Sequence, residues 1–210
     1  SRVMEGSEDI QRLIETGKTR WNEALDHAII KDGYIKSLSS NLNATWSAFE
    51  TLASDLWATA INKNPNTFAI QVAYSSQNEQ STGSRSVDIT ELAQYKFDVK
   101  AMMGTILKKK FKFTDPLKIQ SAYATMLPKK TDTSFLENSD LVLLAGVRHI
   151  LLHKAGIIDE QFVAFTKSTL PIGTAFPVDE AIMYQSINAV IETSRVLLRT
   201  ILDHFEQETK

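Results

Sequence analysis

The chain of 210 residues contains no cysteine, which excludes disulfide bridges and zinc sites built from thiolates. It also lacks a secretory signal and an apolar run long enough to cross a membrane, so the sequence predicts a cytoplasmic protein with no membrane partner. An excess of charge is missing as well, since the formal net charge is only -2. Such a chain has no overall basic field for nucleic acid, and any polyanion must be bound locally.

Several familiar catalytic patterns are absent too. The sequence has no glycine-rich phosphate loop, no Ser-His-Asp set and no cysteine nucleophile, and it shows no internal repeat. Its composition, 43% hydrophobic and 23% charged residues, is close to the globular average. Together with the length, this composition predicts one compact domain over residues 1–210.

The first third of the chain has the periodicity of two long helices. Apolar residues recur at steps of three and four from residue 7 to residue 29, and again from about residue 34 to residue 64. Asp32-Gly33 is expected to break the helix between them, and Asn64-Pro65-Asn66 to end the second. We expect the two helices to pack as an antiparallel pair. Three tryptophans on the apolar stripes are expected in the core: Trp21, Trp46 and Trp57.

Residues 65–88 are the least regular part of the sequence. The segment FAIQVAYS at 68–75 could form a short strand, and the polar run SSQNEQSTGSRS at 75–86 lacks any apolar periodicity. We therefore expect an irregular insertion here that contains a mobile loop.

Helical patterning returns after the insertion. Thr114-Asp115-Pro116 has the cap and first-turn proline of a new helix, Gly156 suits the end of a helix over 141–154, and Asp179 is expected to cap a last helix that ends near residue 206. The sequence thus predicts an all-α bundle of long up-down helices. In the last helix, nine apolar residues are expected to be buried: Ile182, Ile187, Val190, Ile191, Val196, Leu197, Leu198, Ile201 and Leu202.

The helix over 141–154 carries three side chains that do not suit its apolar surroundings. These are Arg148, His149 and His153, in the stretch RHILLH. A buried guanidinium without a partner costs several kcal/mol, so Arg148 must reach a carboxylate, water or an anionic ligand. His149 and His153 are four residues apart and share one helical face, and His153 lies in the last turn, where the helix dipole favours the imidazolium form.

This stretch resembles the signature of the HEPN superfamily, in which an arginine is followed by a polar residue and then by a histidine late in a bundle helix. RHILLH has the arginine-x4-histidine spacing, KAGIIDEQF at 154–162 resembles the continuation of the motif, and LNATWSAFETLASDLW at 42–57 resembles the long early helix. The chain is most similar to stand-alone prokaryotic members of the toxin and phage-defence type. The resemblance implies a HEPN-like helical bundle that covers most of the chain.

The resemblance also implies a metal-independent endoribonuclease that needs no cofactor and leaves a 2',3'-cyclic phosphate. In that reading His153 is the acid/base, Arg148 neutralises charge that develops on the phosphate, His149 orients one of them or touches the phosphate, and Lys154 is a weaker RNA contact. HEPN proteins commonly act as homodimers with a composite site. A cognate antitoxin or another regulatory protein is the implied partner. The alternative within the family is a catalytically silent module that binds a nucleotide or a protein.

Two structural alternatives compete with this reading. In the first, Arg148 forms an internal ion pair with Asp159 or Glu160, and the histidines are ordinary surface or hydrogen-bonded residues. In the second, His149 and His153 begin a metal site with one of those acids as third ligand. Ile150 argues against the metal site, because a metalloprotease helix carries a glutamate at that place.

A basic segment, KKKFKF at 108–113, also has two readings. Together with Lys129-Lys130 it could form a basic edge for RNA, with a phenylalanine stacked on a base. More often such a segment is a solvated helix end whose lysines complement the dipole while its phenylalanines point inward. We favour the second reading.

Overall fold

The computed structural model describes residues 2–75 and 88–208 of the chain. These segments form helices and no strand, which confirms the predicted all-α class. The polar run at 76–86 lies outside the described residues. The helices are α1 (Arg2–Leu25), α2 (Ala28–Lys63), α3 (Pro65–Ser75), α4 (Ile89–Gln94), α5 (Val99–Lys108), α6 (Pro116–Met126), the 3-10 helix η1 (Ser134–Glu137), α7 (Ser139–His153), α8 (Glu160–Thr166) and α9 (Glu180–Glu208).

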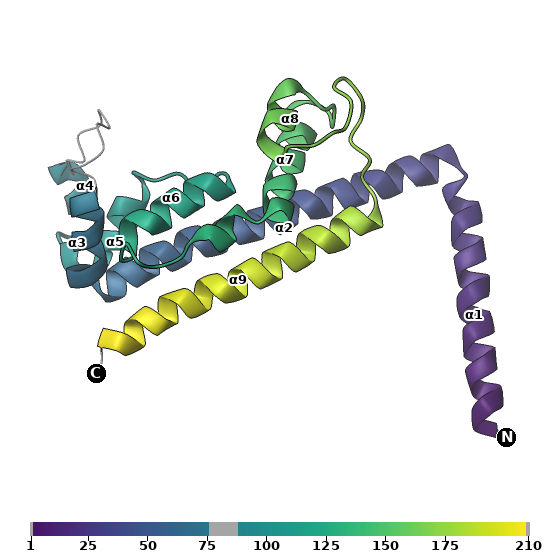
Figure 1. The fold of residues 1–210 in the computed structure, drawn as a ribbon, viewed down its shortest axis with the longest axis horizontal. Coiled ribbons are helices and arrows are strands. Elements are labelled where there is room, and N and C mark those ends of the chain that lie inside the picture. The colour runs from purple at the N-terminus through teal and green to yellow at the C-terminus, as the bar shows by residue number, and fades with distance from the viewer. Residues whose placement is uncertain (1, 76–87, 209–210) are drawn as a thin grey trace.

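Helix α2 is the spine of the molecule. Its 36 residues extend over about 54 Å at the rise of an α-helix, and α3, α5, α6, α7 and α9 all pack along it. Helix α9 runs beside it in the same direction, while α8 and the end of α7 stand on the opposite side of α2 (Figure 1). The two longest helices are therefore parallel neighbours, because the connection from α8 leads back to the start of α2 before α9 begins.

The core is built around the aromatic stripe of α2. Trp46, Phe49 and Trp57 are fully buried, which confirms the core assignment of two of the three tryptophans. Their polar atoms are satisfied: Trp57 Nε1 donates to the carbonyl of Ala122 at 2.9 Å. Tyr123 on α6 donates its hydroxyl to the carbonyl of Ala53 at 2.7 Å. These two hydrogen bonds, one donated by each helix, fix the position of α6 along α2.

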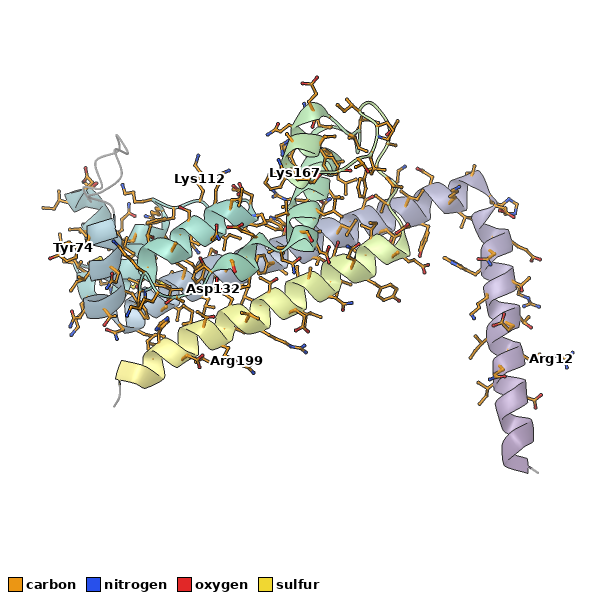
Figure 2. All side chains as sticks on the ribbon, in the orientation of Figure 1. Arg12, Tyr74, Lys112, Asp132, Lys167 and Arg199 are labelled. Atoms are coloured by element: carbon orange, nitrogen blue, oxygen red, sulfur yellow. The ribbon has the colours of Figure 1, made fainter. Side chains whose placement is uncertain are left out.

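The segment KKKFKF has the arrangement that we favoured from the sequence, in which the phenylalanines point inward. Phe111 and Phe113 both pack their rings against Trp57, with centroid distances of 4.8 and 5.9 Å. Lys112 between them is exposed and points away from the helices (Figure 2). The phenylalanines contribute to the core and are not available to stack on a base.

The break between the first two helices lies earlier than the sequence suggested. α1 ends at Leu25 and α2 already begins at Ala28, so α2 continues through Asp32-Gly33. An exposed glycine costs a helix only about 1 kcal/mol, and Lys36 pairs with Asp32 at 2.7 Å across one turn. The predicted antiparallel pairing is wrong as well. α1 meets the start of α2 at a wide angle and projects from the body (Figure 1).

The segment FAIQVAYS is helical and not a strand. It lies within α3, where Phe68 and Val72, four residues apart, are buried on one face. A short apolar run fits both periodicities, and the packing of α3 against α6 and α5 decides for the helix. No helix in residues 2–75 and 88–208 has the length and apolar character that crossing a membrane requires.

The predicted helix starts at Asp115 and Asp179 are confirmed. Asp115 accepts from the backbone N–H of Lys118 at 3.0 Å and Pro116 occupies the first turn of α6, and Asp179 accepts from the N–H of Ile182 at 2.8 Å. The predicted burial of α9 holds for one face only. Leu197 and Ile201 are buried, but four of the nine residues expected in the core are exposed: Ile191, Val196, Leu198 and Leu202. Trp21 on α1 is also exposed.

Two glycines on helices should respond in opposite ways to alanine. A Cβ atom at Gly104 of α5 would lie 2.0 Å from the carbonyl oxygen of Ala58 on α2, whereas Gly33 has open space around it. We expect Gly104→Ala to lower the free energy of unfolding by about 1 to 3 kcal/mol, because the two backbones must separate. Gly33→Ala should raise it by about 0.5 to 1 kcal/mol. Denaturant unfolding followed by circular dichroism measures both, and equal stability of Gly104→Ala and the wild type would contradict the close α2–α5 packing.

Candidate functional site

Helix α7 carries the stretch RHILLH in its last two turns. Asn138 caps its start, where its side-chain oxygen accepts from the N–H groups of Asp140 and Leu141 at 2.8 and 3.3 Å. Gly156 follows its end with a φ of 77°, the left-handed conformation that the sequence predicted there. Leu144, Val147 and Ile150 are fully buried. The helix is thus fixed on the core side and presents its other side to the start of α6 and to α8.

Arg148, His149 and His153 line one groove, of about 630 Å³, between α7, α8 and the start of α6. The rings of the two histidines are 5.0 Å apart between centroids. His153 is exposed at the end of the helix and His149 is half-buried. The other side chains that line the groove come from three elements: Thr114, Asp115, Lys118, Ala145, Gly146, Gln161, Ala164 and Phe165.

Arg148 has a carboxylate partner, but it is not the one expected from the sequence. The nearest acid is Glu50 on α2, whose Oε2 lies 3.9 Å from a terminal nitrogen of Arg148. This distance is too long for a hydrogen bond. The Nε atom of Arg148 is buried and has no hydrogen-bond partner among the described residues. The ion pair with Asp159 or Glu160, considered as a structural alternative, is therefore not formed, and the guanidinium is only loosely held.

The oxygen of Glu50 that faces Arg148 also accepts a hydrogen bond from its own helix. The indole N–H of Trp46 donates to Glu50 Oε2 at 3.1 Å, one helical turn away on α2. Sequence reasoning missed this residue. The sequence nevertheless indicates it, because Glu50 is the only charged residue between Leu42 and Leu52 on an otherwise apolar stripe. An acid in such a place needs a partner.

Asp159 serves the backbone and Lys154. Its side chain accepts from the N–H of Phe162 at 2.8 Å and caps α8, and Lys154 Nζ lies 3.6 Å from it. The hydrogen bond from Phe162, helped by the positive charge of Lys154, holds the pKa of Asp159 below its usual value. Lys154 does not belong to the residues that line the groove.

Lys118 and Gln161 line the groove although sequence reasoning did not single them out. Lys118 lies in the first turn of α6, where its ammonium group pairs with Asp115 at 2.6 Å and donates to the Thr114 hydroxyl at 3.3 Å. Gln161 is in the first turn of α8. Neither has a recognisable pattern in the sequence, because only the packing of α6 and α8 around α7 brings them to His149 and His153.

Helix α8 forms one wall of the groove, and its close packing on α7 requires a glycine. A Cβ atom at Gly146 of α7 would lie 2.4 Å from Thr166 Cγ2 and 3.2 Å from a ring carbon of Phe162. The absence of a side chain at this position lets α8 approach α7 closely. The close approach sets the width of the groove on the side of Gln161.

The groove offers a guanidinium, two imidazoles and an ammonium group within one cavity. Guanidinium and ammonium groups bind phosphate oxygens, and imidazole exchanges protons near neutral pH. Within residues 2–75 and 88–208, no three His, Asp or Glu side chains gather into a set that could hold a metal ion, so neither Asp159 nor Glu160 completes a three-ligand site with the histidines. The chain matches no protein-family model, no curated protein and no solved structure.

The cap at Asp159 gives the stability of the protein a defined pH dependence. Because the folded pKa of this carboxylate is lowered, its stabilising effect is complete above the ordinary aspartate pKa of about 4 and is lost as pH falls through the folded value. Asp159→Asn retains an oxygen for the Phe162 N–H but cannot ionise. We expect the thermal midpoint of the wild type to exceed that of Asp159→Asn at neutral pH, and the difference to shrink on acidification. A constant difference across this range would contradict this assignment, and Asp9→Asn on exposed α1 is the control variant.

Proposed function

We propose that the protein is a metal-independent endoribonuclease of the HEPN type. The proposal rests on one observation: Arg148, His149 and His153 line a single open groove. Their chemistry fits cleavage of a phosphodiester next to a 2'-hydroxyl, which needs a proton acceptor, a proton donor and a positive charge near the phosphate. No water, oxidant or metal ion takes part in this step.

In the proposed reaction the 2'-oxygen of one nucleotide attacks the adjacent phosphorus. The bond from phosphorus to the 5'-oxygen of the next nucleotide breaks, which leaves a 2',3'-cyclic phosphate and a free 5'-hydroxyl. The 2'-hydroxyl proton is removed and the departing 5'-oxygen gains a proton. His153 is proposed for acid/base transfer because it is exposed at the groove, and His149, 5.0 Å from it between ring centroids, is placed to orient it or to contact the phosphate.

Arg148 is proposed to neutralise the charge that builds up on the phosphate oxygens. Its contact with Glu50, at 3.9 Å, is too long for a hydrogen bond and leaves the donors of its terminal nitrogens available to a ligand. This arrangement favours an active enzyme over the alternative, a silent HEPN module that binds a nucleotide or a protein. A silent module would be expected to lock the arginine in a close internal ion pair with no open cavity beside it. Lys118, on the opposite wall of the groove, would add a contact to a neighbouring phosphate.

The biological setting is part of the proposal. We infer a homodimer in which two copies of the groove face one RNA strand, and a toxic or defensive role that a cognate antitoxin or regulatory protein restrains. His153 supports such a composite site because it is exposed and lies at the end of α7, where a second copy of the groove has access to it.

Cleavage in the presence of EDTA is the primary test. We expect purified protein to cleave RNA with EDTA present and to leave 2',3'-cyclic phosphate ends. His153→Ala should reduce the rate by about 10² to 10⁴-fold, the range of general acid–base catalysis. Arg148→Lys should be impaired as well, because an ammonium group does not reproduce the fork of guanidinium donors. His27→Ala is the matched control, since His27 is exposed at the start of α2, away from the groove.

The possible outcomes distinguish a metal-independent ribonuclease from a metal site and from a silent module. Loss of cleavage in EDTA would favour a metal site, and equal rates for His153→Ala and His27→Ala would overturn the assignment of the groove. Binding of nucleotide or RNA without any cleavage would support the silent module.

Glu50 should compete with RNA for Arg148. Replacing it by glutamine keeps an acceptor for Trp46 Nε1 and removes the negative charge behind the guanidinium. We expect Glu50→Gln to bind a non-cleavable 2'-deoxy substrate about two- to fivefold more tightly, the range of one partly exposed ion pair, with a smaller gain at high salt. Fluorescence anisotropy measures the affinity. Asp55→Asn on the same helix, which breaks the pair with Lys108, is the control, and weaker binding by Glu50→Gln would mean that Glu50 positions the arginine.

A further inference from the structure

Helix α1 exposes an apolar face that the described chain leaves largely uncovered. Ile10, Leu13, Ile14 and Trp21 are 59, 71, 51 and 45% exposed. At about 100° per residue, Ile10, Ile14 and Trp21 lie within roughly 20° of the point opposite Arg12 on the helix. Arg12 points away from α9 (Figure 2), so the apolar face is turned toward the open angle between α1 and the body. Gly17 lies on the same face and has open space around it.

Helix α9 exposes a second apolar face, on the side opposite its buried one. Tyr184, Ile191 and Leu198 are spaced by seven residues, and Leu202 follows four residues later. On an ideal helix these four lie within about 40° of one line and opposite the buried Thr193. Their exposed fractions range from 38 to 68%. This face is the reason why the sequence suggested burial all round α9.

The two faces do not meet within one chain. The ring of Trp21 packs edge-on against Tyr34 of α2, with 5.3 Å between centroids, and the hydroxyl of Tyr34 donates to Glu180 at the start of α9. These contacts fix the bend between α1 and α2. Beyond the bend, α1 runs away from α9 along its length (Figure 1).

We propose that α1 of one copy packs on the exposed face of α9 of a second copy, and that the exchange is reciprocal. The two faces together hold eight large side chains: Ile10, Leu13, Ile14, Trp21, Tyr184, Ile191, Leu198 and Leu202. At about half exposure these amount to on the order of 800 Å² per copy, which is one partner's share of a stable protein interface. Their spacing of three, four and seven residues suits helix-on-helix packing.

A second copy fits these faces better than a lipid surface does. Asn188 and Arg195 lie on the line of the α9 face, between Tyr184 and Leu198, and polar residues inside an apolar helical seam select a register against another helix. A helix that binds anionic lipid has a polar face rich in lysine and arginine. Over residues 9–24, α1 instead has three basic and three acidic residues.

The proposed interface is separate from the groove. α9 lies on one side of α2, and α8 with the end of α7 on the other (Figure 1), so a contact through α1 and α9 leaves Arg148 and His153 accessible. It is a different contact from the groove-to-groove pairing proposed above, and the two together would assemble more than two chains. The interface therefore does not rest on the proposed ribonuclease function, and either can fail alone.

The lack of cysteine makes a direct cross-linking test possible. Ile14→Cys protein is mixed with Leu198→Cys protein and treated with a short bis-maleimide reagent at micromolar concentration. We expect a covalent dimer that contains one chain of each kind, identified by mass spectrometry, and sedimentation of the untreated wild type as a dimer or larger species. Ile191→Cys is a second α9 position, in case the register places Leu198 out of reach. Arg12→Cys, on the opposite face of α1, is the matched control.

Three results would overturn the proposal. They are a monomeric wild type, equal cross-linking of the Arg12→Cys and Ile14→Cys proteins to the α9 cysteines, and an intrachain cross-link in an Ile14→Cys/Leu198→Cys double variant diluted with excess wild type. The last result would mean that α1 folds back on its own α9. Circular dichroism of each variant checks that the helices are intact.

Discussion

The apolar stripe of α2 is the constraint on which the rest of the molecule depends. One helix of 36 residues must bury Trp46, Phe49 and Trp57, and even its longest neighbour, α9 with 29 residues, is shorter than α2. Short helices therefore pack along its length, each held by a specific contact such as the bond from Trp57 to the carbonyl of Ala122. Burial of these rings contributes on the order of 2 to 3 kcal/mol each, so the positions of α5, α6 and α7 follow from where the rings lie.

The same stripe explains how the largely buried helix α7 accommodates the charged guanidinium of Arg148. The helix is buried on its core side, and its arginine emerges beside the single acid of the α2 stripe, Glu50. Trp46 holds that carboxylate, while Arg148 keeps a buried nitrogen without a partner. Burying such a donor is costly in a fold that does not use it. A loosely paired guanidinium at the edge of an open groove is the arrangement that an anionic ligand would complete.

The sequence predicted what local chemistry determines. The caps at Asp115 and Asp179, the end of α7 at Gly156 and the core positions of Trp46 and Trp57 all follow from residues within a turn or two of each other. The failed predictions of a strand at 68–75 and of an antiparallel helix pair depend on distant contacts. Phe68 and Val72 suit a strand or a helix equally, and α6 decides between them. The stretch RHILLH indicated which residues gather, but Lys118 and Gln161 reach the groove, and Glu50 reaches Arg148, only through the packing of four helices.

The misplaced core residues of α1 and α9 are of another kind. Periodicity indicates that a side chain such as Ile14 or Leu198 is covered, but it does not say whether the cover comes from the same chain. In residues 2–75 and 88–208 both helices keep an apolar face in solvent, and the contact of Trp21 with Tyr34 keeps the two faces apart. Isolated apolar residues on a surface are ordinary, whereas two apolar faces of similar spacing on one chain are characteristic of an interface. In the proposed dimer, the burial pattern in the sequence is satisfied by a pair of chains and not by one.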